Sequence, residues 1–321
     1  MTRRYVMEFE RGLVELEEKL ASVEKSELVE SPELAEALEV LRGELAVKHR
    51  ETYENLGPWQ RVQISRHPDR PKTEDYLAAL FDDVVEVHGD RVFGDDEAMF
   101  AGLATIGGRR VAVLGHRKGS NTKENVRRNF GSPHPEGFRK AMRVMRLADK
   151  FRLPIVSFLD TAGAFPGIEA EERGQAWAIA ESIATLAAVR VPVVVVGIGE
   201  GGSGGALAIG FGDRIIMLQN SYYSVISPES CASILYRDAN KAAEAAACLS
   251  LTASDLERHG LVDEVLPEPL EGAHVDPVPV IASVGEAVAR ALDELSGTDP
   301  DALVERRYER LRAIGEYADA G

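Results

Sequence analysis

The segment of this sequence that most restricts its fold is an apolar run that ends in a dense cluster of glycines. Residues 191–198 are Val-Pro-Val-Val-Val-Val-Gly-Ile, and residues 199–205 are Gly-Glu-Gly-Gly-Ser-Gly-Gly. A continuous apolar run that is bounded by such a turn is consistent with a buried strand. Glycine adopts backbone conformations that are closed to other residues and lets a ligand approach the main chain. The sequence therefore predicts a buried strand, a glycine turn and a following helix.

The glycine turn has the properties of an anion-binding site. The first N–H groups of a helix have no intrahelical acceptors, and the helix N-terminus carries a partial positive charge. Such a turn favours a bound anion, or the negative oxygen that forms in a transition state. The alternative is that the glycines only allow close packing of the helix. The candidates for this site are Gly201, Gly202, Ser203, Gly204 and Gly205.

A second loop is built in a similar way. Residues 154–159 predict a buried strand, and residues 160–167 follow it as Asp-Thr-Ala-Gly-Ala-Phe-Pro-Gly. The acidic residues at 169–172 then suit the positive end of a helix. Because both loops follow strands and are rich in small residues, one backbone N–H donor from each is expected to point to a common position.

The remainder of the chain alternates between strands and helices. Residues 98–106 and 110–114 are expected to pair through a turn at Gly107-Gly108. The recurring order of strand, strand and helix indicates an α/β fold. The other elements are expected to be strands at 214–218, 222–226 and 261–266, and helices at 76–87, 138–150, 170–189 and, as a polar tail, from about 284.

Residues 1–90 differ from the rest because they show mainly helical periodicity. Leu34, Leu38, Leu41 and Leu45 recur at the spacing of a coiled coil. Two antiparallel helices that form an interaction arm are one interpretation, and a hairpin that packs on its own domain is the other. The expected organisation is a helical arm over residues 1–90 and an α/β domain with C-terminal helices over 91–321.

Charge is distributed unevenly along the chain. The net charge is −16, which argues against nucleic acid as the main partner. Residues 109–152 nevertheless carry 13 lysines and arginines against 3 acids. This basic segment is consistent with a polyanionic ligand, an acidic partner surface or a solvated helix face. The residues expected on the outer face of its helix are Arg139, Arg143, Arg146 and Lys150.

Cysteine content and hydropathy exclude several classes of protein. Cys231 and Cys248 are too few for a four-cysteine zinc site or a disulfide framework, and we interpret them as reduced. No run approaches the ~20 apolar residues of a membrane span, and the N-terminus does not resemble a signal peptide. A cytoplasmic protein without a metal of its own is expected.

Four segments, taken together, resemble a known family. They are EGGSGGALAIG, DTAGAFPG followed by EERGQ, RRNFGSPHPEGFRKAMR and YSVISPESCASIL. They resemble the carboxyltransferase alpha subunits of bacterial acetyl-CoA carboxylase, and the resemblance extends from the helical arm to RRYERL near the C-terminus. It implies a crotonase/ClpP-like spiral of repeated β-β-α units with an N-terminal helical arm.

The resemblance also implies a reaction. Together with a beta subunit, such a chain transfers the carboxyl group of carboxybiotin to acetyl-CoA and forms malonyl-CoA, the first committed step of fatty acid synthesis. Backbone N–H groups stabilise the anion on the biotin ureido oxygen, mainly in the alpha subunit, and the anion on the thioester oxygen, mainly in the beta subunit. Carried onto this sequence, the biotin-side donors are Gly204 or Gly205 with Gly163 or Ala164.

Further contacts and one departure follow from the same resemblance. The implied substrate-binding residues are Gly201, Gly202, Ser203, Phe165, Arg127 and Arg128, the two arginines through CoA phosphates or the partner subunit. The family loop usually has proline where this chain has Ala162, and tyrosine where it has Phe165. These changes remove a fixed φ angle and a hydroxyl group, but no N–H donor.

The implied partners are other components of acetyl-CoA carboxylase. They are a beta subunit in an alpha-two beta-two tetramer, the biotin carboxyl carrier protein and biotin carboxylase. Zinc is expected only in the beta subunit, and no cofactor is expected to be bound covalently to this chain. In agreement, the sequence has no Met-Lys-Met biotinylation site and no Walker-type ATP loop. Neither membranes nor nucleic acids are expected as partners.

Three other functions remain open from the sequence. Residues 201–205 match the Gly-x-Ser-x-Gly turn of serine hydrolases, although no histidine lies in a recognisable motif. A crotonase-like hydratase would need a glutamate near the oxyanion site, and Glu169 and Glu200 are available. A non-catalytic assembly subunit would use only the arm and the basic segment.

Overall fold

A computed structural model describes residues 5–24 and 32–315 of the protein. Within them, the strands form one sheet in the order β1-β2-β3-β4-β5-β6-β8, and β7 pairs with the end of β5. The strands are β1 (Asp82–Glu86), β2 (Met99–Ile106), β3 (Arg109–His116), β4 (Ile155–Thr161), β5 (Val193–Gly202), β6 (Arg214–Leu218), β7 (Tyr222–Ser224) and β8 (Glu264–Leu266).

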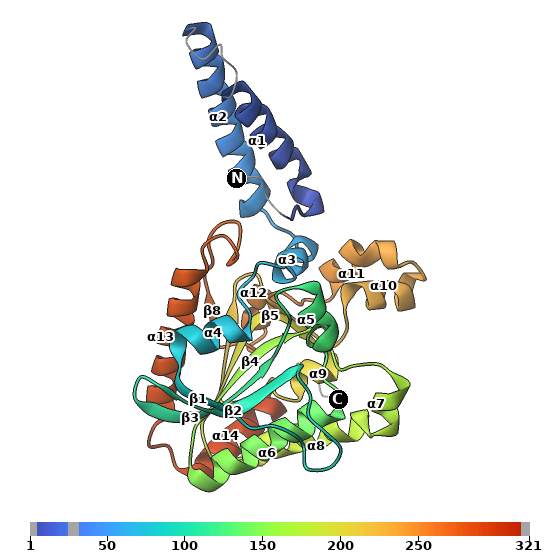
Figure 1. The fold of residues 1–321 in the computed structure, drawn as a ribbon, viewed down its shortest axis with the longest axis vertical. Coiled ribbons are helices and arrows are strands. Elements are labelled where there is room, and N and C mark those ends of the chain that lie inside the picture. Colours follow the sequence, from blue (N-terminus) through green and yellow to red (C-terminus); the bar gives the residue numbers. More distant parts are fainter. Residues whose placement is uncertain (1–4, 25–31, 316–321) are drawn as a thin grey trace, which may run out of the picture.

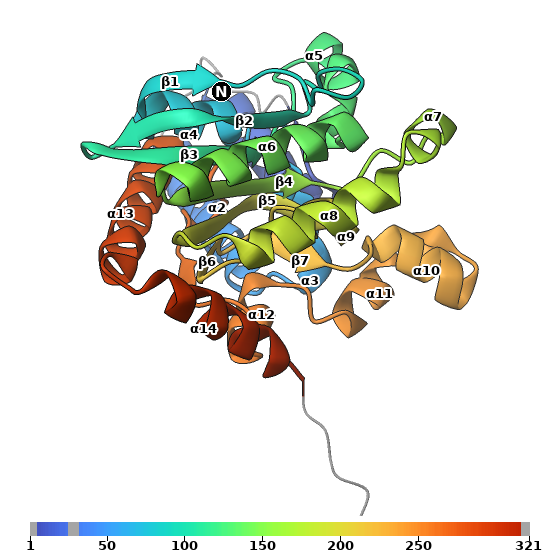
Figure 2. The same cartoon turned by 90° about the horizontal axis from the view of Figure 1, so that it is seen from below.

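Helices cover the sheet and extend beyond it (Figures 1 and 2). The α-helices are α1 (Arg11–Glu24), α2 (Pro32–Glu54), α3 (Pro58–Ser65), α4 (Thr73–Leu80), α5 (Thr122–Arg127), α6 (Pro135–Phe151), α7 (Ile168–Glu172), α8 (Gln175–Ala188), α9 (Ser203–Leu207), α10 (Pro228–Tyr236), α11 (Ala242–Cys248), α12 (Ala253–Arg258), α13 (Pro277–Leu295) and α14 (Pro300–Arg312). Short 3-10 turns are η1 (Glu8–Glu10), η2 (Asn129–Gly131) and η3 (Ala239–Lys241).

The sheet begins as an antiparallel hairpin and continues as a parallel sheet. Gly107 and Gly108 both have positive φ angles, +54° and +77°, as a two-residue hairpin turn requires. This confirms the predicted pairing of β2 with β3. From β3 onward the neighbouring strands are parallel. Their carboxyl ends therefore lie along one edge of the sheet, where ligands of open α/β sheets bind.

The core has two layers because the central strands are buried on both faces. In β4, Ile155 and Leu159 point to one face, whereas Val156 and Phe158 point to the other. Helices α6 and α8 cover the first face, and α4 and α13 cover the second (Figure 2). Opposite the predicted outer face of α6, its apolar side chains recur every three or four residues and are all buried, namely Phe138, Ala141, Met142, Met145 and Ala148.

The N-terminal helices form a hairpin that extends away from the sheet (Figure 1). Helices α1 and α2 pack on each other, and Leu13 and Leu38 are buried between them. Leu41 and Leu45 are half-buried, while the side chain of Leu34 lies outside the described residues. The leucine repeat therefore contributes to the packing of α1 against α2 rather than to packing of the hairpin on the α/β domain.

The predicted helix over 76–87 is wrong in its second half. Helix α4 ends at Leu80, Phe81 is extended, and β1 follows. Residues 84, 85 and 87 are valines, which favour strands, and Val85 pairs with Leu103 of β2. Pairing with the edge of β2 therefore stabilises this segment as a strand more than its local sequence pattern stabilises a helix.

Two other helix predictions need correction. The predicted helix over 170–189 is divided into α7 and α8 at Gly174, whose φ of +81° is left-handed. The C-terminal tail is not polar throughout, because α13 buries a face with Val280, Val284 and Val288. Helix α13 also begins earlier than expected, at Pro277, where proline is favoured in the first turn.

Candidate active site

The two glycine-containing loops lie in direct contact at the carboxyl ends of β4 and β5. Thr161 is the register partner of Gly201, so both loops leave the sheet at the same level. A Cβ atom on Gly202 would lie 2.0 Å from the carbonyl oxygen of Ala162. A Cβ atom on Gly205 would lie 2.3 Å from the backbone nitrogen of Ala164. Only glycine fits at these two positions, because the backbones approach more closely than a side chain allows.

The free N–H groups in the two loops are limited in number. The N–H of Gly163 donates to Thr161 Oγ1 at 3.0 Å, and that of Phe165 donates to the carbonyl of Pro133 at 3.0 Å. Among the described residues, the N–H of Ala164 makes no hydrogen bond. Gly204 and Gly205 lie in the first turn of α9, whose N–H groups have no intrahelical acceptors. The available donors are therefore Ala164 on one loop and Gly204 and Gly205 on the other.

Side chains hold the first loop in place. Gln175 Nε2 donates to the carbonyl oxygens of Pro133 and Phe165, both at 2.9 Å. The ring of Phe165 stacks on His134 with their centroids 4.2 Å apart. These contacts fix the loop although Ala162 replaces the proline of the family pattern. Gln175 ends the EERGQ segment of the sequence, where no role was predicted for it, although its place directly after Gly174 was a usable signal.

A buried histidine lies beneath the second loop. His116, the last residue of β3, is fully buried, and its Nε2 lies 3.2 Å from the carbonyl oxygen of Gly205. Burial lowers the pKa of His116 to about 4. The ring is therefore neutral at pH 7, and Nε2–H donates to the Gly205 carbonyl.

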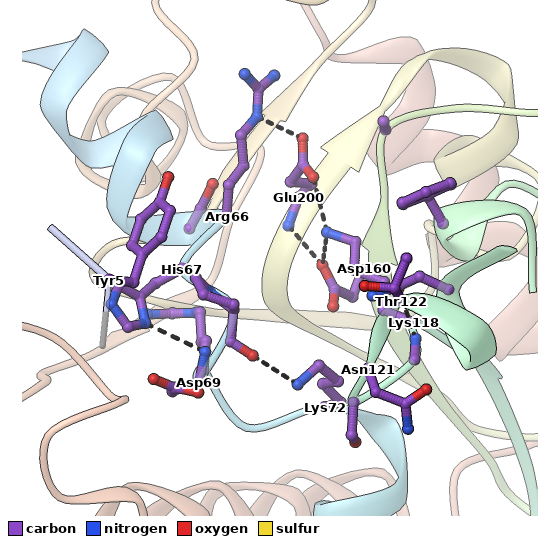
Figure 3. A pocket seen from close by; sticks show the side chains of 18 residues that line it. Tyr5, Arg66, His67, Asp69, Lys72, Lys118, Asn121, Thr122, Asp160 and Glu200 are labelled. Atoms are coloured by element: carbon purple, nitrogen blue, oxygen red, sulfur yellow. Dashed lines mark hydrogen bonds and ion pairs between the residues drawn. The ribbon is translucent and has the colours of Figure 1, made fainter. Parts of the chain in front are cut away.

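A network of buried charges lies at the base of both loops (Figure 3). Asp160 and Glu200 each directly precede one loop, and Lys118 Nζ lies 2.7 Å from Asp160 Oδ1 and 2.7 Å from Glu200 Oε1. Arg66 Nε donates to Glu200 Oε2 at 2.7 Å, and Tyr222 OH donates to the same oxygen at 2.9 Å. Lys118 belongs to the basic segment expected to meet a polyanionic ligand, a partner or solvent, and its pairing with these carboxylates was not visible in the sequence.

The charge network determines the protonation of its members. Burial would raise the pKa of Glu200, but Lys118 and Arg66 lower it to about 2. Burial would lower the pKa of Lys118, but Asp160 and Glu200 raise it above its usual value. Glu200 is thus an ionised, fully paired carboxylate rather than a general base, and Glu169 is exposed. This argues against a hydratase that uses either glutamate.

A cavity lies on each side of the paired loops. One has a volume of about 530 Å³, and its lining includes Ala162 and the charged side chains of Lys118, Asp160 and Glu200 (Figure 3). The other has a volume of about 500 Å³ and is mainly apolar. Ser203 and Gly204 form its rim, and its wall includes Leu207, Tyr223, Val225, Leu261 and Leu311. The first cavity therefore adjoins the charged side chains that precede the loops, and the second offers an apolar surface beside the glycine turn.

Ser203 is exposed at the turn but is not part of a catalytic triad. Its φ angle is +55°, as expected at a sharp strand-to-helix turn. Its hydroxyl has no hydrogen-bond partner among residues 5–24 and 32–315. His116 is directed to the Gly205 carbonyl, and His134 contacts Asn129. The geometry does not support the serine hydrolase alternative.

Most of the basic segment is engaged within the chain. Arg128 is buried, and its Nη1 lies 2.9 Å from Glu74 Oε1 and 2.9 Å from the Lys118 carbonyl oxygen. Arg127 is exposed and lies 2.7 Å from Glu97. Arg139 bonds to Asp90 and Glu136, and Arg143 to backbone carbonyls, so these two arginines are half-buried. Only Arg146 and Lys150 of the predicted outer face are exposed.

The described part of the chain offers neither a metal-binding cluster nor a membrane-spanning helix. It contains no group of three or more His, Cys, Asp or Glu side chains that could hold a metal ion. None of its helices combines the length and apolar character needed to cross a bilayer.

Comparison with known sequences gives matches over nearly the whole chain. The family described as "Acetyl co-enzyme A carboxylase carboxyltransferase-like" matches residues 6–315. The acetyl-coenzyme A carboxylase carboxyl transferase subunit alpha of a Thermus thermophilus strain is 52% identical over 313 residues, which cover 98% of this chain and 99% of that protein. The subunit of the same name from Rubrobacter xylanophilus is 53% identical over 312 residues, 97% of each chain.

Solved structures share the fold at low sequence identity. Transcarboxylase 12S with bound methylmalonyl-coenzyme A has a TM-score of 0.58 and 19% identity, over 78% of this chain and 44% of that chain. A Pseudomonas malonate decarboxylase hetero-tetramer in complex with coenzyme A has a TM-score of 0.54 and 20% identity, over 69% and 89% of the two chains. The predicted crotonase-like α/β fold is thus confirmed. Since the family match and two relatives above 50% identity span almost all of its residues, the chain belongs to the acetyl-coenzyme A carboxylase carboxyltransferase family, as one of its alpha subunits.

Proposed function

We propose that this chain contributes the biotin-side oxyanion hole for carboxyl transfer between carboxybiotin and acetyl-CoA. The donors are the N–H of Ala164 and that of Gly204 or Gly205. The observation that carries the proposal is the contact between the two loops, where these N–H groups are free of other acceptors. When biotin gives up its carboxyl group, its ureido oxygen gains negative charge. Preorganised N–H donors stabilise such charge by about 3 kcal/mol each.

The chain's own side chains support this role without acting as acid or base. In this proposal the biotin nitrogen accepts the proton from the methyl group of acetyl-CoA, so no side chain has to act as the base. Gly201, Gly202, Ser203 and Phe165 shape the surface around the donors. Gly163 has no donor role in this proposal, because its N–H already donates to Thr161 Oγ1.

The partner is proposed to cover the loops. Helices α7, α8 and α10 lie on the same side of the molecule as α9 (Figure 2), and these three helices and the segment just before α10 carry exposed apolar side chains. Those with at least half of their surface exposed are Ile168, Trp177, Val225, Ile234 and Leu235. Large apolar side chains that are exposed near an active site are typical of a protein interface. We assign it to a beta subunit that brings the CoA-side oxyanion hole and its zinc, in an alpha-two beta-two tetramer served by the biotin carrier protein and biotin carboxylase.

Of the two arginines that the sequence suggested for CoA phosphates, Arg127 is the better candidate. Its guanidinium is exposed, whereas that of Arg128 is buried against Glu74. Arg127→Ala should raise the KM for malonyl-CoA roughly tenfold and leave kcat unchanged, because a charged hydrogen bond is worth about 1.5–3 kcal/mol. Kinetics of the reverse reaction test this, and an unchanged KM would remove the phosphate role.

The function itself is tested by adding a bacterial beta subunit and measuring malonyl-CoA decarboxylation that depends on free biotin. Activity is expected only when both chains are present. A stable complex without activity would contradict the assignment of the donors. Absence of any complex would contradict the proposed partner. The same assay without the beta subunit, using an enoyl-CoA, tests the hydratase alternative.

A further inference from the structure

The two oxyanion loops depend on backbone atoms, and backbone atoms have little freedom to adjust. The donors on the first loop follow β4, and those on the second follow β5. Their separation is therefore set by the relative position of two strand ends. A displacement of 1 Å in a reacting geometry can cost about a hundredfold in rate. The β4–β5 ladder is irregular at this point, between Leu159 and Thr161, so a further contact is needed to fix the two strand ends.

Lys118 lies at this point. It follows β3, while Asp160 ends the regular part of β4 and Glu200 lies near the end of β5. These three strands are neighbours in the sheet. The ammonium group of Lys118 contacts both carboxylates at 2.7 Å, and the N–H of Glu200 also donates to Asp160 Oδ1 at 3.1 Å. One lysine thus connects three adjacent strand ends directly beneath both loops (Figure 3).

The surroundings leave room for this connection and hold it in place. Gly199 allows the Asp160 carboxylate to approach β5, because a Cβ there would lie 2.4 Å from Asp160 Oδ1. Gly131 allows the Lys118 stem to pass, because a Cβ there would lie 2.9 Å from Lys118 Cγ. Arg128 donates to the Lys118 carbonyl at 2.9 Å. Both carboxylate side chains are only 8% exposed, so without a cation their repulsion would be strong.

We propose that Lys118 is a positioning residue for the carboxyl transfer, because it holds the Asp160 and Glu200 strand ends at the spacing that the two oxyanion loops require. It does not touch the reacting atoms. The role rests on the proposed function, in which the loops carry the N–H donors. The nearest charged and titratable groups belong to other elements and remain in place, namely Arg66, Arg70, His116, Tyr222 and Glu229.

The main test is Lys118→Met in the complex with the beta subunit, assayed by biotin-dependent malonyl-CoA decarboxylation. We expect kcat to fall about a hundredfold, because the donors are displaced, and KM for malonyl-CoA to change less than about twofold. The matched control is Lys140→Met. Lys140 is also buried between two carboxylates, 2.8 Å from Asp95 and 3.3 Å from Glu86, but neither carboxylate belongs to β4, β5 or the two loops. Both variants should lose stability, and only Lys118→Met should lose kcat.

The pH dependence separates positioning from a general structural role. Lys118 lowers the pKa of Glu200, so without the lysine this pKa is higher and a proton on Glu200 takes the place of the missing positive charge as the pH falls. The ratio of kcat for Lys118→Met to kcat for wild type should therefore rise as the pH is lowered from 8 to 6. The ratio for Lys140→Met should stay flat.

Charge removal provides a rescue and a second route if Lys118→Met does not fold. The double variant Lys118→Met/Glu200→Gln has no buried repulsion, so its kcat should exceed that of Lys118→Met but remain about tenfold below that of Glu200→Gln alone. Equal kcat for the double variant and Glu200→Gln would overturn the proposal, as would unchanged kcat in Lys118→Met or a change in KM only. An inactive wild-type complex would instead refute the proposed function.

Discussion

The two loops of the candidate active site reach the same position by different means. The loop over 160–167 is held by side chains, through the hydrogen bonds of Gln175 and the stacking of Phe165 on His134. The loop over 201–205 is fixed by close backbone contact instead. Gly202 and Gly205 have no side chains, so their backbone lies directly against the backbone of the first loop. Substitutions in the first loop should therefore have graded effects, whereas those at the contact glycines should abolish function.

The largest effect is expected for Gly205→Ala. The new Cβ would lie 2.3 Å from the Ala164 nitrogen, so the two loops must separate and one donor is lost. We expect kcat to fall by a factor of about 10² to 10³ in the biotin-dependent decarboxylation assay, with the complex intact by size-exclusion chromatography.

Gly204→Ala is the control for this substitution. Its Cβ would meet only the side chain of Ile179 at 3.3 Å, and a side chain can move. A loss of less than about threefold is expected. Equal losses for the two variants would show that close contact is not the reason for the glycines. An active Gly205→Ala enzyme would favour the assembly-platform alternative.

An intermediate effect is expected for Gln175→Leu. The substitution leaves the carbonyl group of Phe165 without its donor and that of Pro133 with only the N–H of Phe165, and an unpaired buried group costs about 1–3 kcal/mol. We expect a lower midpoint of urea unfolding and a kcat about tenfold lower, because the Ala164 donor moves.

Ser182→Ala provides the comparison for Gln175→Leu. Ser182 lies in the same helix and donates to the carbonyl of Ala208, also from a buried position. It should lower stability with little change in kcat. If both variants lowered kcat equally, the effect would come from helix α8 as a whole rather than from the loop.

A smaller effect is expected for Phe165→Leu. The stack on His134 is lost, but the backbone contacts of residue 165 with Pro133 and Gln175 remain. An aromatic pair is worth about 0.5–1.5 kcal/mol, so kcat should fall by only about threefold. A collapse of activity comparable to that of Gly205→Ala would mean that the first loop is no more tolerant than the second.

The smallest effect is expected for Ser203→Ala. The hydroxyl has no partner among the described residues, and only the backbone of this turn has a role in the proposal. Carboxyltransferase kcat should remain within about twofold of wild type. Complete loss of activity would revive the serine-nucleophile alternative.

Local features of the fold followed from local patterns. The hairpin at Gly107-Gly108 and the inward face of α6 were predictable because turn chemistry and helical periodicity involve neighbouring residues. The errors occurred where a distant element intervened. Strand β1 replaced the end of a predicted helix because β2 offered it an edge, and α13 buries an apolar face because the sheet lies beneath it.

The composition of the candidate site was visible in the sequence, but its internal contacts were not. The two small-residue loops, and the resemblance they carry, are contiguous stretches of chain. The choice of Ala164 over Gly163 depends on a hydrogen bond within the folded loop, from Gly163 to Thr161 Oγ1. The burial of Arg128 similarly depends on Glu74, which comes from a different helix.

The chain's order of amino acids therefore accounts for the strands, the glycine turns and the family. Folding alone brings Lys118 to Glu200, 82 residues away, and places both beneath two loops that must touch. The reason is physical. Backbone preference and amphipathic period act between residues close in the chain, whereas the positions of strand ends depend on the order and register of the whole sheet.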